Sequence, residues 1–432
     1  MDTLQLFQII GILVVFFAFV GLMMTKKLAT ILALPLMAIL MALIAGIPLY
    51  SNNPKVFNIA TNILSDGSAK LATTIITTFF GAWFGFLLKK TGISEGIIRK
   101  AAEMAGGDKP VRIATIFFLI GIVIFSTGGG LGMTILAGTI IIPILLTAGI
   151  SALTASIVLL ASQTVGSFFS MSGWSMTAQL YKLPVSVISK YTIIFTIPAI
   201  ILFEVMLIWF IKRDKTIRKG WTMPDAGPVR KAPQVRTIAL IAPILPVVMV
   251  FAFKLDIISS ILLAVIATIL LTTPKHPAQV MVSALIEGIQ SVAGAAALMV
   301  GIGMLLAAVT APAVSAILTP LIKAVLPTSP ITYVLFFSIL SPLALYRGPL
   351  NTYGLGSGVG VLMAASGLSP LATMLAMRNL GKTQGLCDPT NTYNVWVADF
   401  ADVDVNDITK KTIGWATLVV FVSQIMAAFI AF

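Results

Sequence analysis

The sequence has almost none of the residues that form disulfides or transition-metal sites. It contains one cysteine, Cys387, and one histidine, His276, among 432 residues. One cysteine excludes an intrachain disulfide, and these two residues cannot supply the ligands of a structural zinc site. We therefore expect no cofactor, and Na⁺ is the one metal ion that the oxygen donors described below would suit.

Charge is scarce as well. Charged residues make up 10% of the chain and hydrophobic residues 58%, with a mean hydropathy of +1.04. Soluble domains carry roughly 25% charged residues, so no separate soluble domain is predicted. Several uncharged runs reach about 20 residues, the length of a helix that crosses a bilayer, and they do not alternate as barrel strands do. The sequence predicts an all-α polytopic protein in a lipid bilayer.

Motifs of hydrolases and nucleotide-binding proteins are absent too. There is no HExxH and no GxSxG, and GGGLG at 128–132 lacks the Lys-Ser/Thr pair that completes a phosphate-binding loop. The net charge of +13 comes from residues that flank apolar runs and form no aromatic-interleaved basic face. We therefore expect neither an enzyme nor a nucleic-acid-binding protein.

The apolar runs predict about ten full spans. The first lacks a basic n-region and a small-residue cleavage site, so we expect a retained span and not a signal peptide. The predicted spans lie at 5–24, 28–50, 71–88, 152–178, 188–211, 237–253, 257–273, 287–308, 370–397 and 412–431.

Four segments have interruptions that ordinary spans lack. Residues 113–181 contain no charge, and arms at 113–125 and 134–148 flank STGGGLGMT at 126–134. Arms this short predict a re-entrant hairpin, 113–148. A second hairpin is predicted at 331–366, with the tip RGPLNT at 347–352. The spans 152–178 and 370–397 are predicted to be discontinuous, because SQTVGSFFSMSG and TQGLCDPTN interrupt them.

The most basic segment is the central loop, 212–236. It carries eight basic and two acidic residues, a net charge of +6, which places it in the cytoplasm by the positive-inside rule. Counting crossings from this loop places both termini outside an inner cell membrane.

The two halves of the chain align at an offset of 218 residues. Gly130, Thr134 and Gly138 fall on Gly348, Thr352 and Gly356, and later matches follow with offsets of 219 and 220. Each half has five crossings, so the halves, 1–211 and 237–432, are predicted to be inverted repeats. In such proteins the binding site lies near the midplane at the interface of the repeats, where helices are interrupted.

The charges near these interruptions favour an anionic substrate. The first half offers neutral donors only, whereas the second carries Arg347, Arg378 and Lys382 against one carboxylate, Asp388. Arg347 is the first candidate, because a guanidinium can hold a carboxylate with two hydrogen bonds; the alternative is a structural ion pair with Asp388. Asp388 would carry a proton or bind Na⁺, or alternatively cap a helix. Arg378 and Lys382 would contact substrate or extend towards an interface.

The tips and breaks resemble those of the ion transporter superfamily. GGGLGMT and GPLNT stand where that superfamily has its hairpin-tip motifs, and SQTVGSFFSMSG and TQGLCDPTN are similar to its unwound segments. Within it, the chain most resembles the gluconate–proton symporter and citrate permease branch. The resemblance implies a homodimeric, elevator-like secondary carrier of organic anions. The first tip has no asparagine at 132–134, which favours protons or a single cation.

Residues near both interruptions are assigned to the candidate site. The substrate-binding residues are predicted to be Ser126, Thr127, Gly130, Thr134, Arg347, Asn351, Thr352, Thr383 and Asn391. The ion-coupling residues are predicted to be Asp388, Thr164, Ser170, Ser172 and Thr390. Glu204, within an apolar span, is a weaker candidate for proton movement.

The functional hypothesis is a secondary active transporter. It would carry a small organic anion, such as the hydroxy-carboxylates gluconate or citrate, coupled to H⁺ or Na⁺. The alternative is a cation–proton antiporter of the same superfamily.

Overall fold

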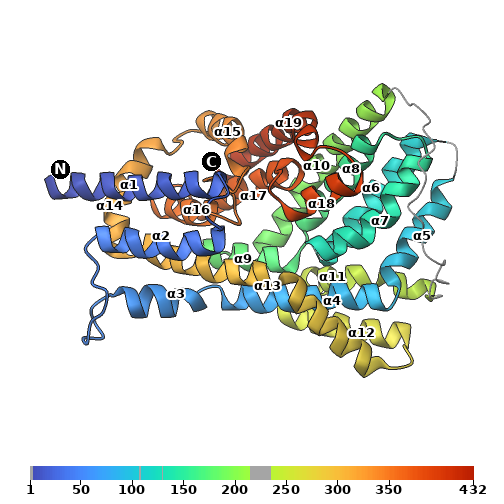
Figure 1. Ribbon diagram of the computed structural model, residues 1–432, viewed down its shortest axis with the longest axis horizontal. Coiled ribbons are helices and arrows are strands. Elements are labelled where there is room, and N and C mark those ends of the chain that lie inside the picture. The colour runs from blue at the N-terminus through green and yellow to red at the C-terminus, as the bar shows by residue number, and fades with distance from the viewer. Residues whose placement is uncertain (1–2, 107–108, 129, 215–234) are drawn as a thin grey trace.

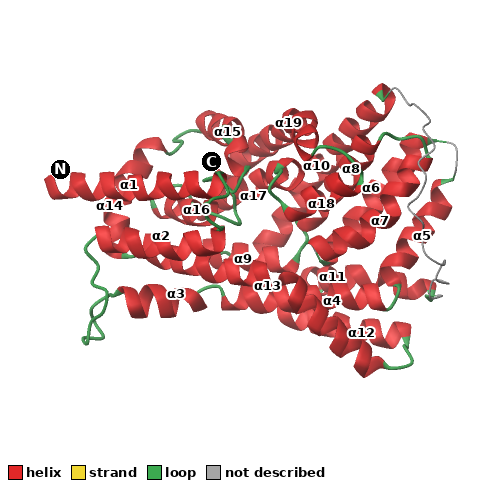
Figure 2. Cartoon of the chain, viewed as in Figure 1, coloured by secondary structure: helices red, strands yellow, loops and turns green. Residues whose placement is uncertain are grey.

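The computed structural model describes residues 3–106, 109–128, 130–214 and 235–432, and in this part of the chain every regular element is a helix (Figures 1 and 2). Most of the central basic loop, 215–234, lies outside the described residues. The helices of the first half are α1 (Thr3–Met24), α2 (Thr30–Ile44), α3 (Asp66–Ala69), α4 (Ala72–Lys90), α5 (Ile93–Ala105), α6 (Pro110–Thr127), α7 (Leu131–Thr147), α8 (Ala152–Ser167), α9 (Met171–Tyr181) and α10 (Val185–Arg213), with a π-helical segment at Ile59–Ser65.

The second half repeats this order. Its helices are α11 (Leu245–Ala252), α12 (Ile257–Thr272), α13 (Pro277–Val309), α14 (Pro312–Val325), α15 (Pro330–Ile339), α16 (Gly356–Ala365), α17 (Pro370–Cys387), α18 (Thr392–Phe400) and α19 (Val405–Ala431), with 3₁₀ segments at Thr237–Ile244 and Ser341–Ala344.

The helices confirm an all-α polytopic membrane protein. Among the described residues six helical segments are long and apolar enough to cross a membrane, and eight if each of two bent pairs counts as one span. The spans predicted at 28–50, 237–253 and 257–273 correspond to shorter apolar segments. The arm predicted at 113–125 is too short. α6 begins at Pro110, which suits the first turn of a helix, and Pro110–Thr127 is one of the six segments long enough to cross a membrane.

Matching local signals support the repeat. Ser151 accepts a hydrogen bond from the Thr154 amide and caps α8, and Ser369 caps α17 in the same way through the Ala372 amide. Just before these serines, Gly149 and Gly367 have φ of 83° and 130°, a region that side chains disfavour. The two serines are 218 residues apart, and so are the two glycines. Each half therefore has the same glycine turn and serine cap between its hairpin and its broken helix.

Two short helices, α5 and α14, have no counterpart in the sequence interpretation. α5 falls within a stretch that reads as a basic loop, and α14 within an apolar stretch left without a span. The two lie at opposite ends of the long axis, beside the first and second hairpin respectively (Figure 1). A bend of 103° separates α14 from α15. Their positions agree with two repeats that enter the membrane from opposite sides.

The longest helix, α13, packs closely along α3 and α4. It has 33 residues, about 50 Å of helix at 1.5 Å per residue. Gly288 approaches the backbone of Ala82 and Trp83, and Gly303 approaches Gly67 so closely that a Cβ there would lie 2.3 Å from the Gly67 carbonyl oxygen. Glycines allow helices in membranes to approach this closely. These helices run beside the hairpins and broken helices as a separate layer (Figure 1).

The buried apolar side chains form two clusters. One contains Phe117 and Leu159 of the first hairpin region, and the other contains Phe337 and Leu375 of the second. Most of α8 packs in the first cluster and most of α17 in the second, whereas α18 returns to the first. The interruptions of the broken helices therefore lie where the two clusters meet.

Candidate substrate and ion site

The first hairpin tip supplies hydroxyl groups that are mostly paired with its own backbone. Ser126 and Thr127 donate to the carbonyls of Val123 and Ile124 at 2.7 and 2.8 Å. Gly130, with φ of 92°, turns the chain into α7. Thr134 is fully buried, and its Oγ1 lies 2.9 Å from Gln163 Oε1 on α8. This contact joins the tip to the helix that breaks next.

The second hairpin tip is organised by Asp388, at the end of α17. The buried carboxylate accepts hydrogen bonds from the Tyr346 amide at 3.1 Å, the Thr390 amide at 2.9 Å and the Thr390 hydroxyl at 2.7 Å, all on Oδ1. Asn351 approaches Oδ2 through Nδ2 at 3.4 Å. Four donors around one carboxylate hold its negative charge in place, so Asp388 fixes the tip against α17. Its predicted role in ion coupling stays a prediction.

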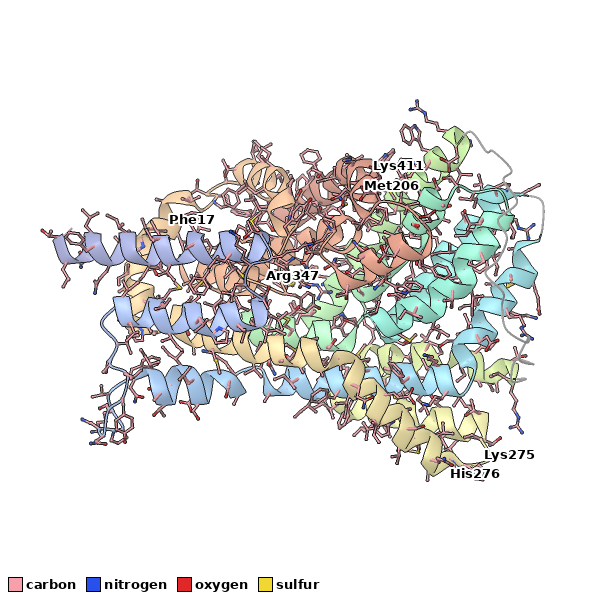
Figure 3. The ribbon with its side chains drawn as sticks, viewed as in Figure 1. Phe17, Met206, Lys275, His276, Arg347 and Lys411 are labelled. Carbon is pink, nitrogen blue, oxygen red and sulfur yellow. The ribbon has the colours of Figure 1, made fainter. Side chains whose placement is uncertain are left out.

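Arg347 also lies at the second hairpin tip. Within the described part of the chain its guanidinium makes no hydrogen bond and no ion pair, so the alternative of a structural pair with Asp388 is not realised. Arg347 and Tyr346 have φ of 58° and 55°, a conformation that side chains adopt at a cost and that clusters at functional sites. Arg347 interacts electrostatically with Tyr393 of α18 and lies near the middle of the molecule (Figure 3).

The two broken helices touch each other directly. A Cβ on Gly385 of α17 would lie 2.8 Å from Thr164 Oγ1 of α8, so the crossing requires glycine. Thr383, two residues earlier, is buried, and its hydroxyl has no hydrogen-bond partner among the described residues. An unpaired buried hydroxyl is costly, so Thr383 is suited to a ligand contact, as the sequence predicts.

The remaining amides at the second break complete the local network. Asn391 donates to the Gln384 carbonyl at 2.9 Å and to the Tyr393 hydroxyl at 3.0 Å. Thr352 donates its backbone N–H to Gln384 Oε1 at 3.3 Å. Each hairpin tip therefore contacts a buried glutamine of the helix that follows it, Gln163 in the first half and Gln384 in the second.

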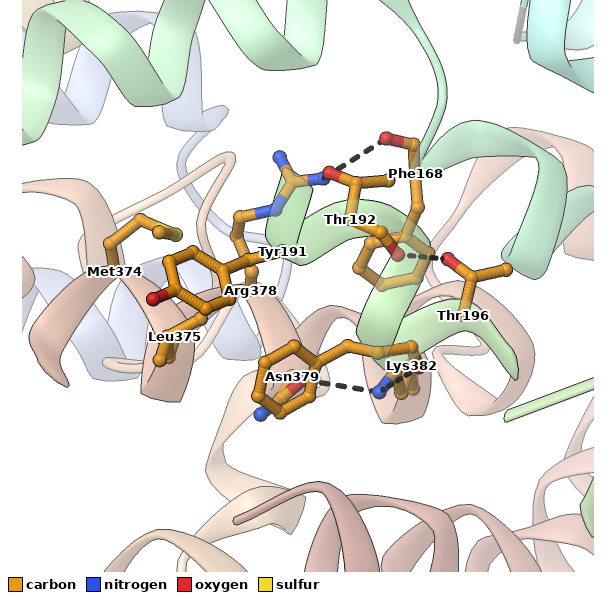
Figure 4. A pocket seen from close by; sticks show the side chains of 10 residues that line it. Phe168, Tyr191, Thr192, Thr196, Met374, Leu375, Arg378, Asn379 and Lys382 are labelled. Carbon is orange, nitrogen blue, oxygen red and sulfur yellow. Dashed lines mark hydrogen bonds between the residues drawn. The ribbon is translucent and has the colours of Figure 1, made fainter. Parts of the chain in front are cut away.

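A small, mostly apolar pocket lies between α10, α17 and the break of the first repeat, with Arg378, Asn379 and Lys382 among its lining residues (Figure 4). Arg378 reaches across it and donates to the Phe168 carbonyl at 3.0 Å, Thr192 Oγ1 at 2.9 Å and Thr177 Oγ1 at 3.2 Å. It also interacts electrostatically with Tyr353, which follows the second tip. Arg378 thus links the break of one repeat to the tip of the other, and it does not extend to an interface.

Lys382 lies one turn further along α17, and 1% of its surface is exposed. Its Nζ donates to Ser423 Oγ at 2.6 Å, Asn379 Oδ1 at 3.1 Å and the Phe195 carbonyl at 3.2 Å. In the part of the chain that the structure describes, neither Lys382 nor Arg378 pairs with a carboxylate. Arg347, Arg378 and Lys382 are therefore three basic side chains near the helix breaks that form no ion pair with a carboxylate of the described residues.

The predicted ion-coupling residues have different hydrogen-bond partners, and their role stays a prediction. Asp388 and Thr390 are in contact, but Thr164 donates back to the Leu160 carbonyl and Ser170 caps α9 by accepting from the Gly173 amide. A search of the described residues finds no group of three or more His, Cys, Asp or Glu that could hold a metal ion.

Several other residues are placed by the structure alone. Gln384, Tyr393 and Asn379 surround the site, and only Gln384 falls in a motif quoted from the sequence, TQGLCDPTN.

Glu204 hydrogen-bonds Thr115 of α6 and leaves Oε2 without a partner in the described chain, away from both tips. His276 lies at the edge of the molecule (Figure 3), which agrees with its predicted place in a loop.

Comparisons with known proteins identify the fold. No protein-family profile matches the sequence, and no curated protein matches it. The structure is similar to that of the YdaH transporter of Alcanivorax borkumensis, which is described as having an unusual topology. The TM-score is 0.63 at 14% sequence identity, over 93% of this chain and 96% of that one. The chain therefore has the fold of a membrane transporter.

Proposed function

We propose that the protein is a secondary active transporter of a small organic anion, coupled to H⁺ or Na⁺ and working by alternating access. The observation that carries this proposal is the set of three basic side chains, Arg347, Arg378 and Lys382, that have no ion-pair partner among the described residues near the second tip and the helix breaks. A charge inside a bilayer costs at least about 2.5–3.5 kcal/mol, and the bound anion would offset that cost. The likeness to a transporter fold supports transport, in place of catalysis, as the activity.

The neutral groups around the cations favour a hydroxy-carboxylate, such as gluconate or citrate. Within the described residues the Arg347 guanidinium has no hydrogen bond and no ion pair, so its donors would be available to a carboxylate. The buried Thr383 hydroxyl would pair with a substrate hydroxyl or a second carboxylate. Both N–H groups of Asn391 already donate to Gln384 and Tyr393, so Asn391 would contact the substrate through its carbonyl oxygen, as acceptor for a substrate hydroxyl. The resemblance to the gluconate and citrate carriers supports the same class.

Uptake into proteoliposomes tests the proposal. Purified protein is reconstituted, and labelled gluconate, citrate and lactate are offered under an imposed pH or Na⁺ gradient. We expect saturable accumulation of at least one carboxylate, absent from empty liposomes and from vesicles without a gradient. No accumulation across a broad carboxylate panel would contradict the proposal.

A cation–proton antiporter is the second candidate, and it rests on Asp388. Three donors occupy Oδ1, whereas Oδ2 has only the long contact with Asn351, which leaves room for a cation. This candidate predicts that alkali cations release protons from acid-loaded vesicles, and that Arg347→Gln leaves this activity unchanged.

The membrane arrangement belongs to the same proposal. The protein would lie in the inner cell membrane as a homodimer, with both termini outside and the central basic loop in the cytoplasm. Single cysteines at Gln5 and Lys410, in a Cys387→Ser background, test the orientation. We expect an impermeant thiol reagent added to whole cells to label a cysteine at position 5 and not one at position 410.

A further inference from the structure

Within the described residues, the Lys382 amine contacts neutral hydrogen-bond partners only. An ammonium group has three N–H donors, and its three acceptors are a serine hydroxyl, an asparagine carbonyl and the backbone carbonyl of Phe195. The pocket can therefore hold the proton on Nζ. None of the three acceptors carries a charge that would keep it there.

The charged and titratable groups that face Lys382 do not favour its positive charge. On α17 the neighbour is Arg378, one turn away and of the same sign. α10 contributes Tyr191 with Thr192 and Thr196, α19 contributes Ser423, and the break of the first repeat contributes the ring of Phe168. No aspartate or glutamate of the described chain lies among the lining residues. No carboxylate of the described pocket would stabilise an ammonium group here, and lysine, unlike arginine, can lose its proton when buried.

An anion bound in this pocket would favour the protonated, positively charged form of Lys382. Asn379 is 2% exposed, and its Nδ2 has no hydrogen-bond partner in the described structure, while its Oδ1 accepts from Lys382. An anionic oxygen beside Asn379 would take that free N–H and place a negative charge near both cations (Figure 4). Anion binding would then strengthen proton binding at Lys382, and by reciprocity the proton would strengthen anion binding.

We propose that Lys382 carries the coupling proton, which makes the protein an anion–proton symporter. This inference rests on the proposed function and names its coupling ion. The proton comes from water on the side where the anion enters, binds Lys382 Nζ, and leaves to water on the other side when the anion is released. One N–H bond of Lys382 forms as an O–H bond of water breaks, the reverse occurs on release, and no other covalent bond of substrate or protein changes.

The test compares three variants of the full-length protein in proteoliposomes. Lys382→Arg keeps the positive charge but does not release it. Lys382→Gln removes the charge. Lys323→Arg, at an exposed position in the last turn of α14, is the matched control. Exchange of labelled for unlabelled carboxylate shows that each variant is folded and binds substrate.

For wild type and Lys323→Arg we expect accumulation driven by a pH gradient and proton uptake together with the anion. Lys382→Arg should exchange anion but lose pH-driven accumulation, and its affinity should be constant from roughly pH 6 to 9. Lys382→Gln should bind anion about tenfold more weakly or worse, also independently of pH.

Two results would overturn the inference alone: pH-driven accumulation retained by Lys382→Arg, or wild-type accumulation driven by Na⁺ and insensitive to pH. Failure of the wild type to exchange any carboxylate would overturn the proposed function together with it.

Discussion

Replacing Arg347 should separate substrate binding from stability. The side chain makes no hydrogen bond and no ion pair within the described chain, so Arg347→Gln removes none of either and loses only the electrostatic interaction with Tyr393. Substitutions of this kind change the free energy of unfolding by less than about 0.5 kcal/mol. The backbone at this position has φ of 58°, and glutamine adopts that left-handed conformation at the same cost as arginine, so the substitution adds no strain.

The effect on the substrate should be large by comparison. A hydrogen bond to a charged group contributes about 1.5–3 kcal/mol, and 1.36 kcal/mol corresponds to a factor of about ten. Loss of one such bond to a carboxylate should therefore raise the KM for uptake by roughly 10- to 150-fold.

Arg378→Gln is the matched control, because Arg378 makes three hydrogen bonds inside the protein, to Phe168, Thr177 and Thr192. It should lower the apparent Tm in detergent as well as the transport rate, with a loss of about 1–3 kcal/mol for each buried acceptor left unpaired. Concentration-dependent uptake and thermal unfolding of both variants provide the comparison. The reasoning fails if Arg347→Gln keeps the wild-type KM, or if it loses as much stability as Arg378→Gln.

Three further predictions concern the framework of the site. Asp388→Ala should destabilise the second tip by about 1–3 kcal/mol, because several partly buried donors lose their acceptor; Asp388→Asn, which keeps one acceptor oxygen, should cost less, and equal Tm values for the two would argue against the network. Gly303→Ala should cost more than about 1–3 kcal/mol, because its Cβ would meet the Gly67 carbonyl at 2.3 Å, whereas Gly414→Ala, with nothing within 4 Å, should be neutral; similar thermal shifts would contradict the helix packing. Hydrogen bonds from Ser259 hold the pKa of Asp256 below its usual range, so its stabilising effect at the start of α12 is present above the unfolded pKa of about 3.9 and is lost as the pH falls through the lower folded pKa. Asp256→Ala should therefore cost about 1 kcal/mol at neutral pH, and its Tm should converge with that of wild type only in acid.

The sequence predicts the fold well, because the bilayer leaves few choices for an uncharged chain. An apolar run must be helical to satisfy its backbone hydrogen bonds, and the four interruptions at glycine, proline and hydroxyl residues mark the hairpins and broken helices. The repeat can also be predicted from the sequence, because a glycine occurs at the same place in each half, and both Gly149 and Gly367 adopt a positive φ. α5 and α14 are missed, because such short helices beside the main spans have no run of spanning length.

The candidate site is less predictable, since its contacts depend on how the helices are rotated and crossed. Sequence alone ranks Arg347 above Arg378 and Lys382, and nothing in the local pattern shows that α17 turns Arg378 and Lys382 towards α10. The hydrogen-bond partners of Asp388 cannot be predicted from the sequence either, because the Tyr346 amide that donates to it lies 42 residues away in the chain. Asn379 carries no signal in the sequence, and only its unpaired buried nitrogen distinguishes it.

The central claim is that the cations at the helix breaks bind an anion for transport. Its most direct test is the uptake of labelled carboxylates by proteoliposomes that contain wild-type protein or Arg347→Gln, under imposed pH and Na⁺ gradients. The account predicts gradient-driven accumulation of a carboxylate by the wild type and loss of that uptake at low substrate concentration in the variant. It would be contradicted if neither protein accumulated any carboxylate and both released protons in response to alkali cations.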